Sequence, residues 1–416
     1  MFQKTAFLLV LSFYCLVAQS QKPSITSVYK RPQQLNDGVS TATLQKVRID
    51  DKMIHAMTDS IFNGTYPNIH SVLIMRDNKL VYENYFSGND ETRGVGYAGF
   101  KQHHRDSLHD LRSVTKSLVG TAILIAIAQG KIKSVDQRVF DFFPEHGRYD
   151  TGMKRDITVS HLMNMTAGLA WDEETISYAD STNSERLMNN SEDAIDFVLR
   201  QPMINSPGKQ YIYSGGATQL LVGIVYRATG MQIDKFIEEY LFKPLSIKTF
   251  TWVKNQDGEP SGASGLRMRS RDMVKIGAVY LNEGRWKGKQ IIPAHLVEET
   301  LKSQISTPYK DSVAPHIGYS NQFWIPTEMI EGKPITWTQA QGNGGQIIVI
   351  DKQNDLVAVI TAGNYNLSNL PKSSWGIYPT FIYPAVIKKS KKCNEKNIKV
   401  YIINPLFCLQ AYITTT

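Results

Sequence analysis

Cysteine is scarce in this 416-residue chain, which contains only three. Cys15 lies in the first twenty residues, whereas Cys393 and Cys408 lie close to the C-terminus, so the body of the chain has none. The last two cysteines allow one disulfide at most, which excludes a fold held together by several. The core must therefore come from apolar packing, for which a chain of this length with 42% hydrophobic residues suffices.

Long apolar runs are also missing, except at the start of the chain. Lys4 is followed by the run AFLLVLSFYCLVA and then by Ala18-Gln19-Ser20. A basic residue, an apolar run too short to span a bilayer and a small-x-small pattern are typical of a secretory signal. We therefore expect residues 1–20 to be a signal peptide, the protein to be exported to the periplasm or the medium, and no transmembrane segment.

The body of the chain carries no strong excess of charge of one sign. The net charge is +8, and residues 388–416 alone hold six lysines and one glutamate. Such a run is typical of a solvated tail, so no nucleic-acid partner is predicted. A Walker A loop and a dinucleotide fingerprint after a strand are both absent, so we expect no nucleotide cofactor.

Strand patterns occur near both ends of the chain. Residues 69–88 predict a hairpin around Asp77-Asn78, and residues 345–351 and 355–363 predict two further strands. Helical patterns lie between them, at residues 113–131, 156–169, 191–201, 215–230, 232–245 and 270–284. We therefore predict an α/β (α+β) fold, with an antiparallel sheet built from both chain ends, flanking helices and a mainly helical inserted subdomain.

The division of the chain follows from this pattern. Residues 21–44 are polar, with scattered proline and glutamine, and are predicted to be a linker. Residues 45–387 form the predicted domain, and residues 388–416 an appended basic tail.

One helical segment places a serine and a lysine three residues apart, in HDLRSVTKSLVGTAILIAIAQGK. Two other S-x-x-K patterns occur, but one lies in the predicted linker and one spans a Pro-Gly turn. Only Ser113 opens a long apolar helix, on which Lys116 shares its face. Burial disfavours a charged amine, and a neutral amine can take the proton of a serine nucleophile. The alternative is a helix-capping serine and a lysine that reaches solvent.

Two later segments favour a catalytic interpretation. Tyr213 follows a Pro-Gly turn and precedes an apolar helix, where a tyrosinate could share a proton with Lys116. The segment AQGNGGQIIVI is rich in glycine as it enters a strand, so its N–H groups could bind an oxyanion. Taken singly, a core aromatic and a hairpin turn explain these features equally well.

Over residues 45–387 the chain resembles the serine β-lactamases and penicillin-binding proteins, in particular relatives of the class C β-lactamases and their esterase cousins. The segments that carry the resemblance are LRSVTKSLVG, ITVSHLMNMTAGL, SPGKQYIYSGG, LFKPLSIKTFTW, ASGLRMRSRDMVKIGAVYLNEGRWKGKQII and GNGGQIIVIDKQNDLVAVIT. The resemblance implies an acyl-transferring hydrolase with Ser113 as nucleophile, Lys116 as base and Tyr213 as the tyrosine of a Y-x-N element. It also implies an oxyanion hole from the N–H groups of Ser113 and Asn343, beside Gly342.

Two positions depart from that family pattern. Gly215 stands where the Y-x-N element has asparagine, and Ala340 where a third element has a cationic or aromatic residue. Because these positions help to hold a β-lactam, we expect an esterase or amidase that acts on a small-molecule or peptide substrate. A β-lactamase or D-Ala-D-Ala carboxypeptidase, and a non-catalytic cell-wall peptide or penicillin binding protein, remain as alternatives.

Two further stretches contain polar groups near these motifs. The loop WDEETISYAD could bring Tyr178 to the substrate, whereas Trp171 could equally belong to the core. The stretch HHRDSLHD is dense in His and Asp, but its spacing fits no common zinc pattern. We expect it to be a polar loop at the rim of the site and predict no metal.

Overall fold

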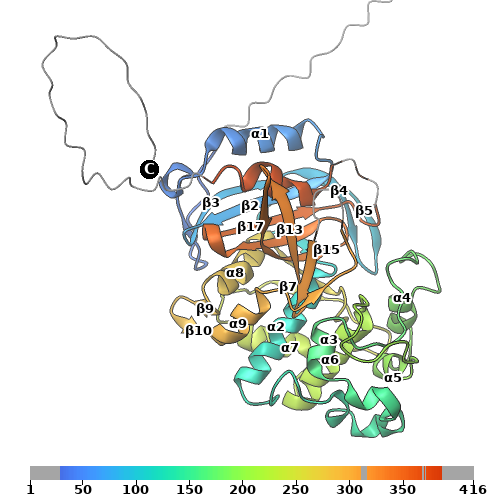
Figure 1. Cartoon of the computed structure of the whole chain (residues 1–416). Helices are drawn as coiled ribbons and strands as arrows, with labels where there is room; N and C mark the ends of the chain where they lie inside the picture. The colour runs from blue at the N-terminus through green and yellow to red at the C-terminus, as the bar shows by residue number, and fades with distance from the viewer. Residues whose placement is uncertain (1–28, 311–315, 368–369, 371, 387–416) are drawn as a thin grey trace, which may run out of the picture.

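A computed structural model describes residues 29–310, 316–367, 370 and 372–386 of the chain. Its centre is a ten-stranded sheet, drawn in blue and orange in Figure 1. The strands run across the sheet in the order β1 (Ser40–Thr41), β3 (Lys79–Tyr85), β2 (Ile69–Arg76), β17 (Leu356–Ala362), β16 (Gln346–Asp351), β15 (Thr338–Gly342), β13 (Phe323–Ile330), β12 (His316–Ser320) and β11 (Ile305–Ser306), with β14 (Lys333–Thr336) paired to β13.

The sheet is built from both ends of the chain, as predicted. β2 from the N-terminal part pairs with β17 from the C-terminal part, and all pairs are antiparallel except β1 with β3. Every residue of β2, β16 and β17 is buried, which is why apolar residues follow one another along these strands rather than alternating with polar ones. The polar exceptions in β2 are His70, Ser71 and Arg76. The predicted hairpin over residues 69–88 and the two later strands are confirmed.

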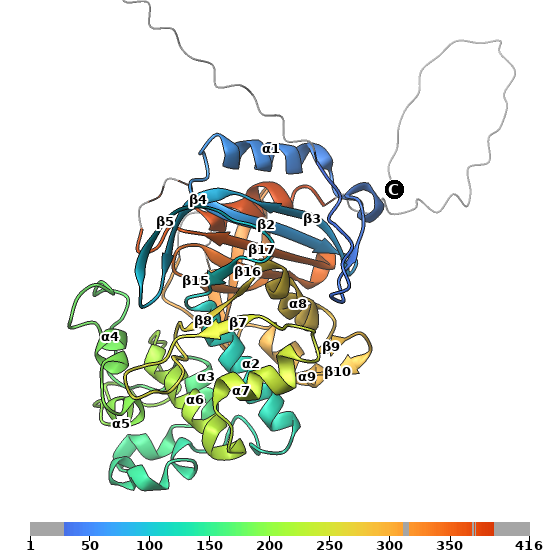
Figure 2. The same cartoon turned by 180° about the vertical axis from the view of Figure 1, so that it is seen from behind.

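Helices cover the two faces of the sheet. α1 (Asp51–Phe62) and the turn Tyr378–Ile382 cover one face, while α8 (Ser270–Leu281) covers the other, as Figures 1 and 2 show. α2 (Val114–Ala128) contacts β15, carries apolar residues all round and is buried along most of its length. Each sheet face thus closes its own apolar core, and the larger one continues into the helical part.

The part of the chain between the two groups of sheet strands is mainly helical and lies below the sheet in Figure 1. α6 (Gly215–Thr229) packs on α2; Ser214 caps its start, and Gly230 ends it with φ of 74°. The remaining helices are α3 (Val159–Met163), α4 (Ser184–Asn189), α5 (Ala194–Leu199), α7 (Ile233–Ile237) and α9 (Ala294–Thr300). Three short sheets complete the fold: β4 (Ser87–Thr92) with β5 (Gly96–Gln102), β6 (Leu108–Asp110) with β8 (Leu266–Arg269) and β7 (Phe250–Trp252), and β9 (Arg285–Trp286) with β10 (Lys289–Gln290).

The segment predicted to be a linker contributes to the fold from residue 29 onward. β1 pairs with β3, and Val39 and Leu44 are fully buried. The predicted signal peptide, the first part of that linker and the basic tail lie outside the described residues. Within the part of the chain that the structure describes, no helix has the length and apolarity needed to cross a membrane.

Candidate active site

Ser113 follows a short strand, β6, and one turn, which together fix its position. β6 ends at Asp110, the N–H of Leu111 donates to Leu266 O at 3.0 Å, and Arg112 adopts a left-handed φ of 49°. Such a φ is uncommon outside glycine and marks a tightly constrained turn. Ser113 then stands at the N-cap position of α2, and its side chain makes no capping hydrogen bond. The free N–H groups of this helix start favour negative charge.

Lys116 lies one turn further along α2 and is 1% exposed. Its Nζ is 3.3 Å from Ser113 Oγ and donates to Ala263 O at 3.1 Å. The predicted serine–lysine contact is therefore present in the structure. A buried amine needs such partners because desolvation of an unpaired charge is costly.

Tyr213 precedes α6 and completes the predicted trio. Lys116 Nζ lies 4.6 Å from the centroid of the Tyr213 ring. The hydroxyl of Tyr213 is hydrogen-bonded to the side chain of Ser113. Burial and the nearby Glu173 carboxylate nevertheless raise the pKa of Tyr213 well above its usual value. The resting group is thus a neutral phenol rather than the tyrosinate that the sequence suggested.

Glu173 is the residue of this site that sequence reasoning missed. It is 1% exposed, and its Oε1 lies 3.4 Å from Lys116 Nζ. Trp171 Nε1 donates to its Oε2 at 2.6 Å, and Tyr178 donates to Oε1 at 3.4 Å. Burial raises the pKa of Glu173, and Lys116 opposes that rise. Its only sequence signal was a pair of acids in a loop between aromatic residues.

The glycine at position 215 is explained by this carboxylate. The N–H of Gly215 donates to Glu173 Oε2 at 2.6 Å, and a Cβ at Gly215 would lie 2.8 Å from that oxygen. A side chain at position 215 and the carboxylate of Glu173 would therefore compete for the same space. Position 215, which the Y-x-N element fills with asparagine, therefore has room only for glycine while Glu173 keeps this place.

β15 passes close to the nucleophile through Gly342. A Cβ at Gly342 would lie 2.3 Å from Leu111 O and 3.0 Å from Ser113 N, so only glycine allows this approach. Asn343 follows directly and lines the same cleft as Ser113. Ala340, two residues earlier on the same strand face, is fully buried and offers no polar group to the cleft.

Two adjoining hollows meet at Ser113. One has a volume of about 560 Å³ and the other of about 640 Å³, and both are lined by Ser113, Tyr178, Asn343 and Asn366. Tyr213 and Trp324 line the first hollow, and their rings lie 5.6 Å apart. The expected position of Tyr178 at the cleft is thus observed, while Trp171 is buried and supports Glu173.

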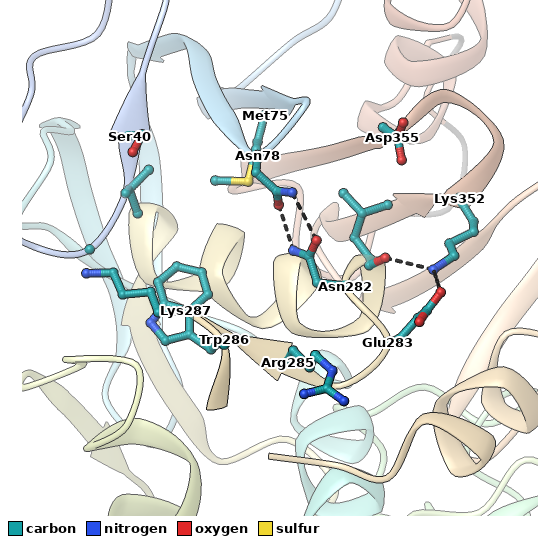
Figure 3. Close-up of a pocket in the computed structure, with 14 residues that line it drawn as sticks. Ser40, Met75, Asn78, Asn282, Glu283, Arg285, Trp286, Lys287, Lys352 and Asp355 are labelled. Atoms are coloured by element: carbon teal, nitrogen blue, oxygen red, sulfur yellow. Dashed lines mark hydrogen bonds and ion pairs between the residues drawn. The ribbon is translucent and has the colours of Figure 1, made fainter. Parts of the chain in front are cut away.

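A further hollow of about 640 Å³ lies between β1, the end of α8 and the β9–β10 hairpin (Figure 3). Ser113 is not among the residues that line it. Four of its polar side chains are paired with one another. Asn78 and Asn282 exchange hydrogen bonds of 2.9 and 2.6 Å, and Lys352 donates to Glu283 at 3.1 Å. Nothing in it resembles an acyl-transfer site.

The prediction that HHRDSLHD forms a polar rim loop is wrong for two of its histidines. His103 and His109 are 5% and 2% exposed, because β6 carries this stretch into the interior beside β2. His104, between them in sequence, is exposed as predicted.

Several known proteins are similar to this chain in sequence and in fold. The model of the family described as Beta-lactamase matches residues 63–372. A protein of Escherichia coli O157:H7, named as a candidate D-alanyl-D-alanine carboxypeptidase, is 23% identical over 419 residues, covering 88% of this chain and 90% of the relative. Esterase EstB of Burkholderia gladioli is 24% identical over 272 residues, covering 60% of this chain and 65% of the esterase. The solved structure of a family VIII carboxylesterase matches the fold with a TM-score of 0.61 at 16% identity, over 80% of this chain and 97% of that one.

Proposed function

The chain belongs to the Beta-lactamase family, whose relatives named above are hydrolases, and we propose that it is an exported serine hydrolase that cleaves an ester or amide through an acyl-enzyme on Ser113. One observation carries the proposal. Ser113 Oγ, Lys116 Nζ and the ring of Tyr213 converge at a cleft, with the lysine almost fully buried.

The reaction follows from these positions. Ser113 Oγ attacks the substrate carbonyl and gives its proton to Lys116, while the hydroxyl of Tyr213 relays a proton to the leaving group. The N–H groups of Ser113 and Asn343 receive the oxyanion, and each such donor lowers the barrier by about 3–4 kcal/mol. Water then attacks the acyl-enzyme, the same groups take its proton, and the acid product leaves with Ser113 restored.

Glu173 has a supporting role in this scheme. Its carboxylate lies against Lys116 and not against the nucleophile, so it positions the amine and sets its electrostatic surroundings.

The substrate preference rests on what the cleft lacks. With Gly215 and Ala340, no side-chain amide and no cation stand at the positions that orient a β-lactam. An unmet hydrogen bond to a desolvated group costs about 1–3 kcal/mol. We therefore favour uncharged short acyl esters over β-lactams and D-Ala-D-Ala peptides.

Labelling with a fluorophosphonate tests the nucleophile. The adduct is expected on Ser113, with labelling and ester hydrolysis both lost in Ser113→Ala. Ser206→Ala is the matched control, because Ser206 begins another S-x-x-K pattern at an exposed position. An adduct on another serine, or undiminished labelling of Ser113→Ala, contradicts the proposal.

A substrate comparison separates the alternatives. We expect kcat/KM for p-nitrophenyl butyrate to exceed that for nitrocefin under one condition, with little release of D-alanine from D-Ala dipeptides. The reverse order favours the β-lactamase alternative. Tight penicillin binding without turnover of any of the three substrates favours the receptor alternative.

The export part of the proposal has its own test. Expression of the whole chain in a host with a general secretion pathway should give a mature protein that begins at Gln21. Recovery of the uncleaved chain in the cytoplasm alone would contradict it.

A further inference from the structure

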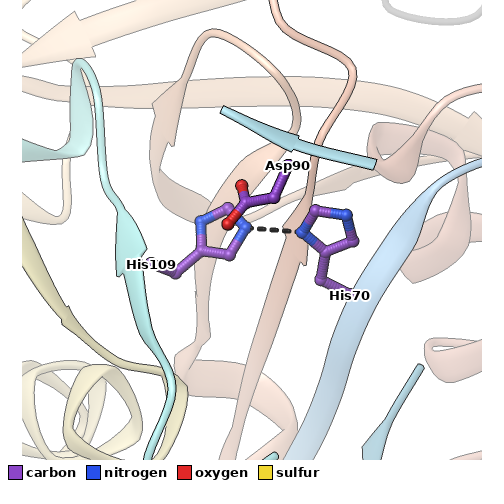
Figure 4. Close-up of side chains that lie close together, drawn as sticks. All are labelled: His70, Asp90 and His109. Atoms are coloured by element: carbon purple, nitrogen blue, oxygen red, sulfur yellow. Dashed lines mark hydrogen bonds between the residues drawn. The ribbon is translucent and has the colours of Figure 1, made fainter. Parts of the chain in front are cut away.

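Three strands from three different sheets bring a second set of polar side chains together in the interior. His70 comes from β2, Asp90 from β4 and His109 from β6, and their ligand atoms lie within 4.8 Å of one another (Figure 4). All three are at most 4% exposed. His103, just after β5, stacks on His70 with ring centroids 3.8 Å apart and closes one side of the cluster.

The hydrogen bonds define which nitrogens carry lone pairs. His109 Nδ1 lies 3.1 Å from Asp110 O, and since a carbonyl can only accept, Nδ1 carries the proton. His109 Nε2 then carries a lone pair, which accepts a hydrogen bond from His70 Nδ1 at 2.8 Å. A backbone carbonyl that fixes one histidine nitrogen so that the other faces a partner is the usual outer shell of a metal ligand.

All three imidazole rings are buried, and burial disfavours the charged form of an imidazole. The rings therefore offer the uncharged nitrogens that metal ligands need.

The cluster also leaves charge and hydrogen-bonding capacity unmet. Among the described residues, no cation lies within ion-pair distance of Asp90, whose carboxylate accepts from the N–H of Glu91 at 2.9 Å and from Tyr365 at 3.5 Å. The nearby cations are already paired, Arg112 with Glu91 at 2.6 Å and Arg267 with Asp110 at 2.6 Å. The buried Nε2 atoms of His70 and His103 have no hydrogen-bond partner in the described part of the chain. Buried polar atoms are normally satisfied by protein, by water or by an ion, so these two nitrogens leave room for a bound ligand.

We propose that His70, His109 and Asp90 form a binding site for one divalent transition-metal ion of the Zn²⁺ type. Two imidazoles and one carboxylate are a common ligand set for such ions and leave a fourth position open. Nitrogens about 2.0–2.1 Å from a tetrahedral Zn²⁺ lie roughly 3.3 Å apart, so the two rings must separate by about 0.5 Å on binding. The His70 proton moves from Nδ1 to the unpartnered Nε2, so binding needs no change in the number of protons on this ring.

The ion would fasten the β4–β5 hairpin and β6 to the central sheet. Tyr365 connects the site to the nucleophile, since it contacts Asp90 and its ring stacks under the Arg112 guanidinium at 4.4 Å. An ion in this place would support the turn that presents Ser113 without contacting the substrate.

Metal binding to the whole mature protein tests this proposal directly. After chelator treatment and dialysis against Zn²⁺ or Co²⁺, wild type should retain one equivalent of metal, show cobalt d–d absorption bands and melt several degrees higher than the metal-free form. His70→Gln and Asp90→Asn should each lose the bound metal and the thermal shift. His104→Gln should keep both, because His104 is exposed and lies outside the cluster.

X-ray absorption at the zinc edge of the wild type keeps the test decisive if a variant fails to fold. It should report two imidazoles and one carboxylate in the first shell. Wild type that retains no stoichiometric metal overturns the proposal. So does metal that persists in folded His70→Gln and Asp90→Asn, or a first shell without imidazole.

Discussion

The carboxylate of Glu173 accepts the backbone N–H of Gly215 at 2.6 Å, and thereby occupies the space where position 215 would otherwise carry a side chain. The other oxygen of the same carboxylate lies 3.4 Å from Lys116 Nζ. A buried acid thus stands beside the candidate base, and it comes from a loop distant in sequence from the glycine that makes room for it.

Glu173→Gln should lower kcat/KM for an ester by about 10²-fold, because Glu173 Oε1 lies 3.4 Å from Lys116 Nζ and holds that amine beside Ser113 Oγ. Steady-state ester kinetics measure the loss, and Glu298→Gln, a change of the same kind at an exposed position, should leave kcat/KM unchanged. An unchanged kcat/KM in a folded Glu173→Gln would contradict the role given to Glu173.

The same variant should change how stability depends on pH. Burial raises the pKa of Glu173, so its contribution to stability is fully present below about pH 4.5 and is lost as pH rises through the folded-state pKa. Glutamine cannot lose this proton, so the free energy of unfolding of Glu173→Gln should fall less than that of wild type on going from pH 5 to pH 8. Urea unfolding at the two pH values measures the difference. A larger fall in the variant would mean that the pKa of Glu173 is depressed instead.

Gly215→Ala should destabilise the protein by about 1–3 kcal/mol and weaken ester hydrolysis. Its Cβ would lie 2.8 Å from Glu173 Oε2 and 2.9 Å from Ala263 Cβ, and overpacking of this kind costs more than alanine gains in a helix. In Gly215→Ala with Glu173→Ala the loss should be smaller than the sum of the two single losses, as measured by urea unfolding. Gly215→Ala with Glu298→Gln should be additive. Additivity of the first pair would contradict the competition for space.

Tyr213→Phe should lower kcat for esters by about 10²–10⁴-fold without loss of thermal stability, because it removes a proton-relaying hydroxyl and keeps the ring. Tyr211→Phe is the matched control. Its hydroxyl is also buried but has no hydrogen-bond partner among the described residues, so its removal should leave kcat unchanged. Equal kcat values in wild type and folded Tyr213→Phe would make Tyr213 purely structural.

Gly342→Ala should abolish most activity, because β15 must move away from the nucleophile to admit a Cβ that would lie 3.0 Å from Ser113 N. Steady-state ester kinetics and fluorophosphonate labelling rates measure the loss. Gly147→Ala, at an exposed turn where an added Cβ meets nothing within 4 Å, is the control. Full activity in Gly342→Ala would show that the oxyanion site does not depend on this approach.

Local patterns were sufficient for much of the fold and for two residues of the candidate site. The apolar run after Ser113 can only be a buried helix, and S-x-x-K on a helix brings Ser113 and Lys116 to one face through a spacing of three. The apolar strands near both chain ends predicted a sheet assembled from distant segments, because strands buried on both faces require neighbours and covering helices. These features depend on periodicity within a few residues, which a sequence displays directly.

The environment of Lys116 depended on tertiary structure. Glu173 is distant from Lys116 in sequence, and the fold of its loop brings the two together. The contact also requires glycine at position 215, whose N–H binds the same carboxylate. The resting state of Tyr213 was likewise beyond the sequence, since its pKa is raised by burial and by a neighbour from that loop.

The histidine cluster also depended on tertiary structure rather than on local sequence. His103 and His109 are close in sequence and were predicted to lie at an exposed rim, with no metal. His70 and Asp90, which complete the cluster, come from strands whose pairing the local sequence does not specify. The sequence alone determined which side chains can share one element, because helix and strand periods are local. The tertiary structure alone decided which side chains from different elements share a desolvated space, because that depends on long-range packing.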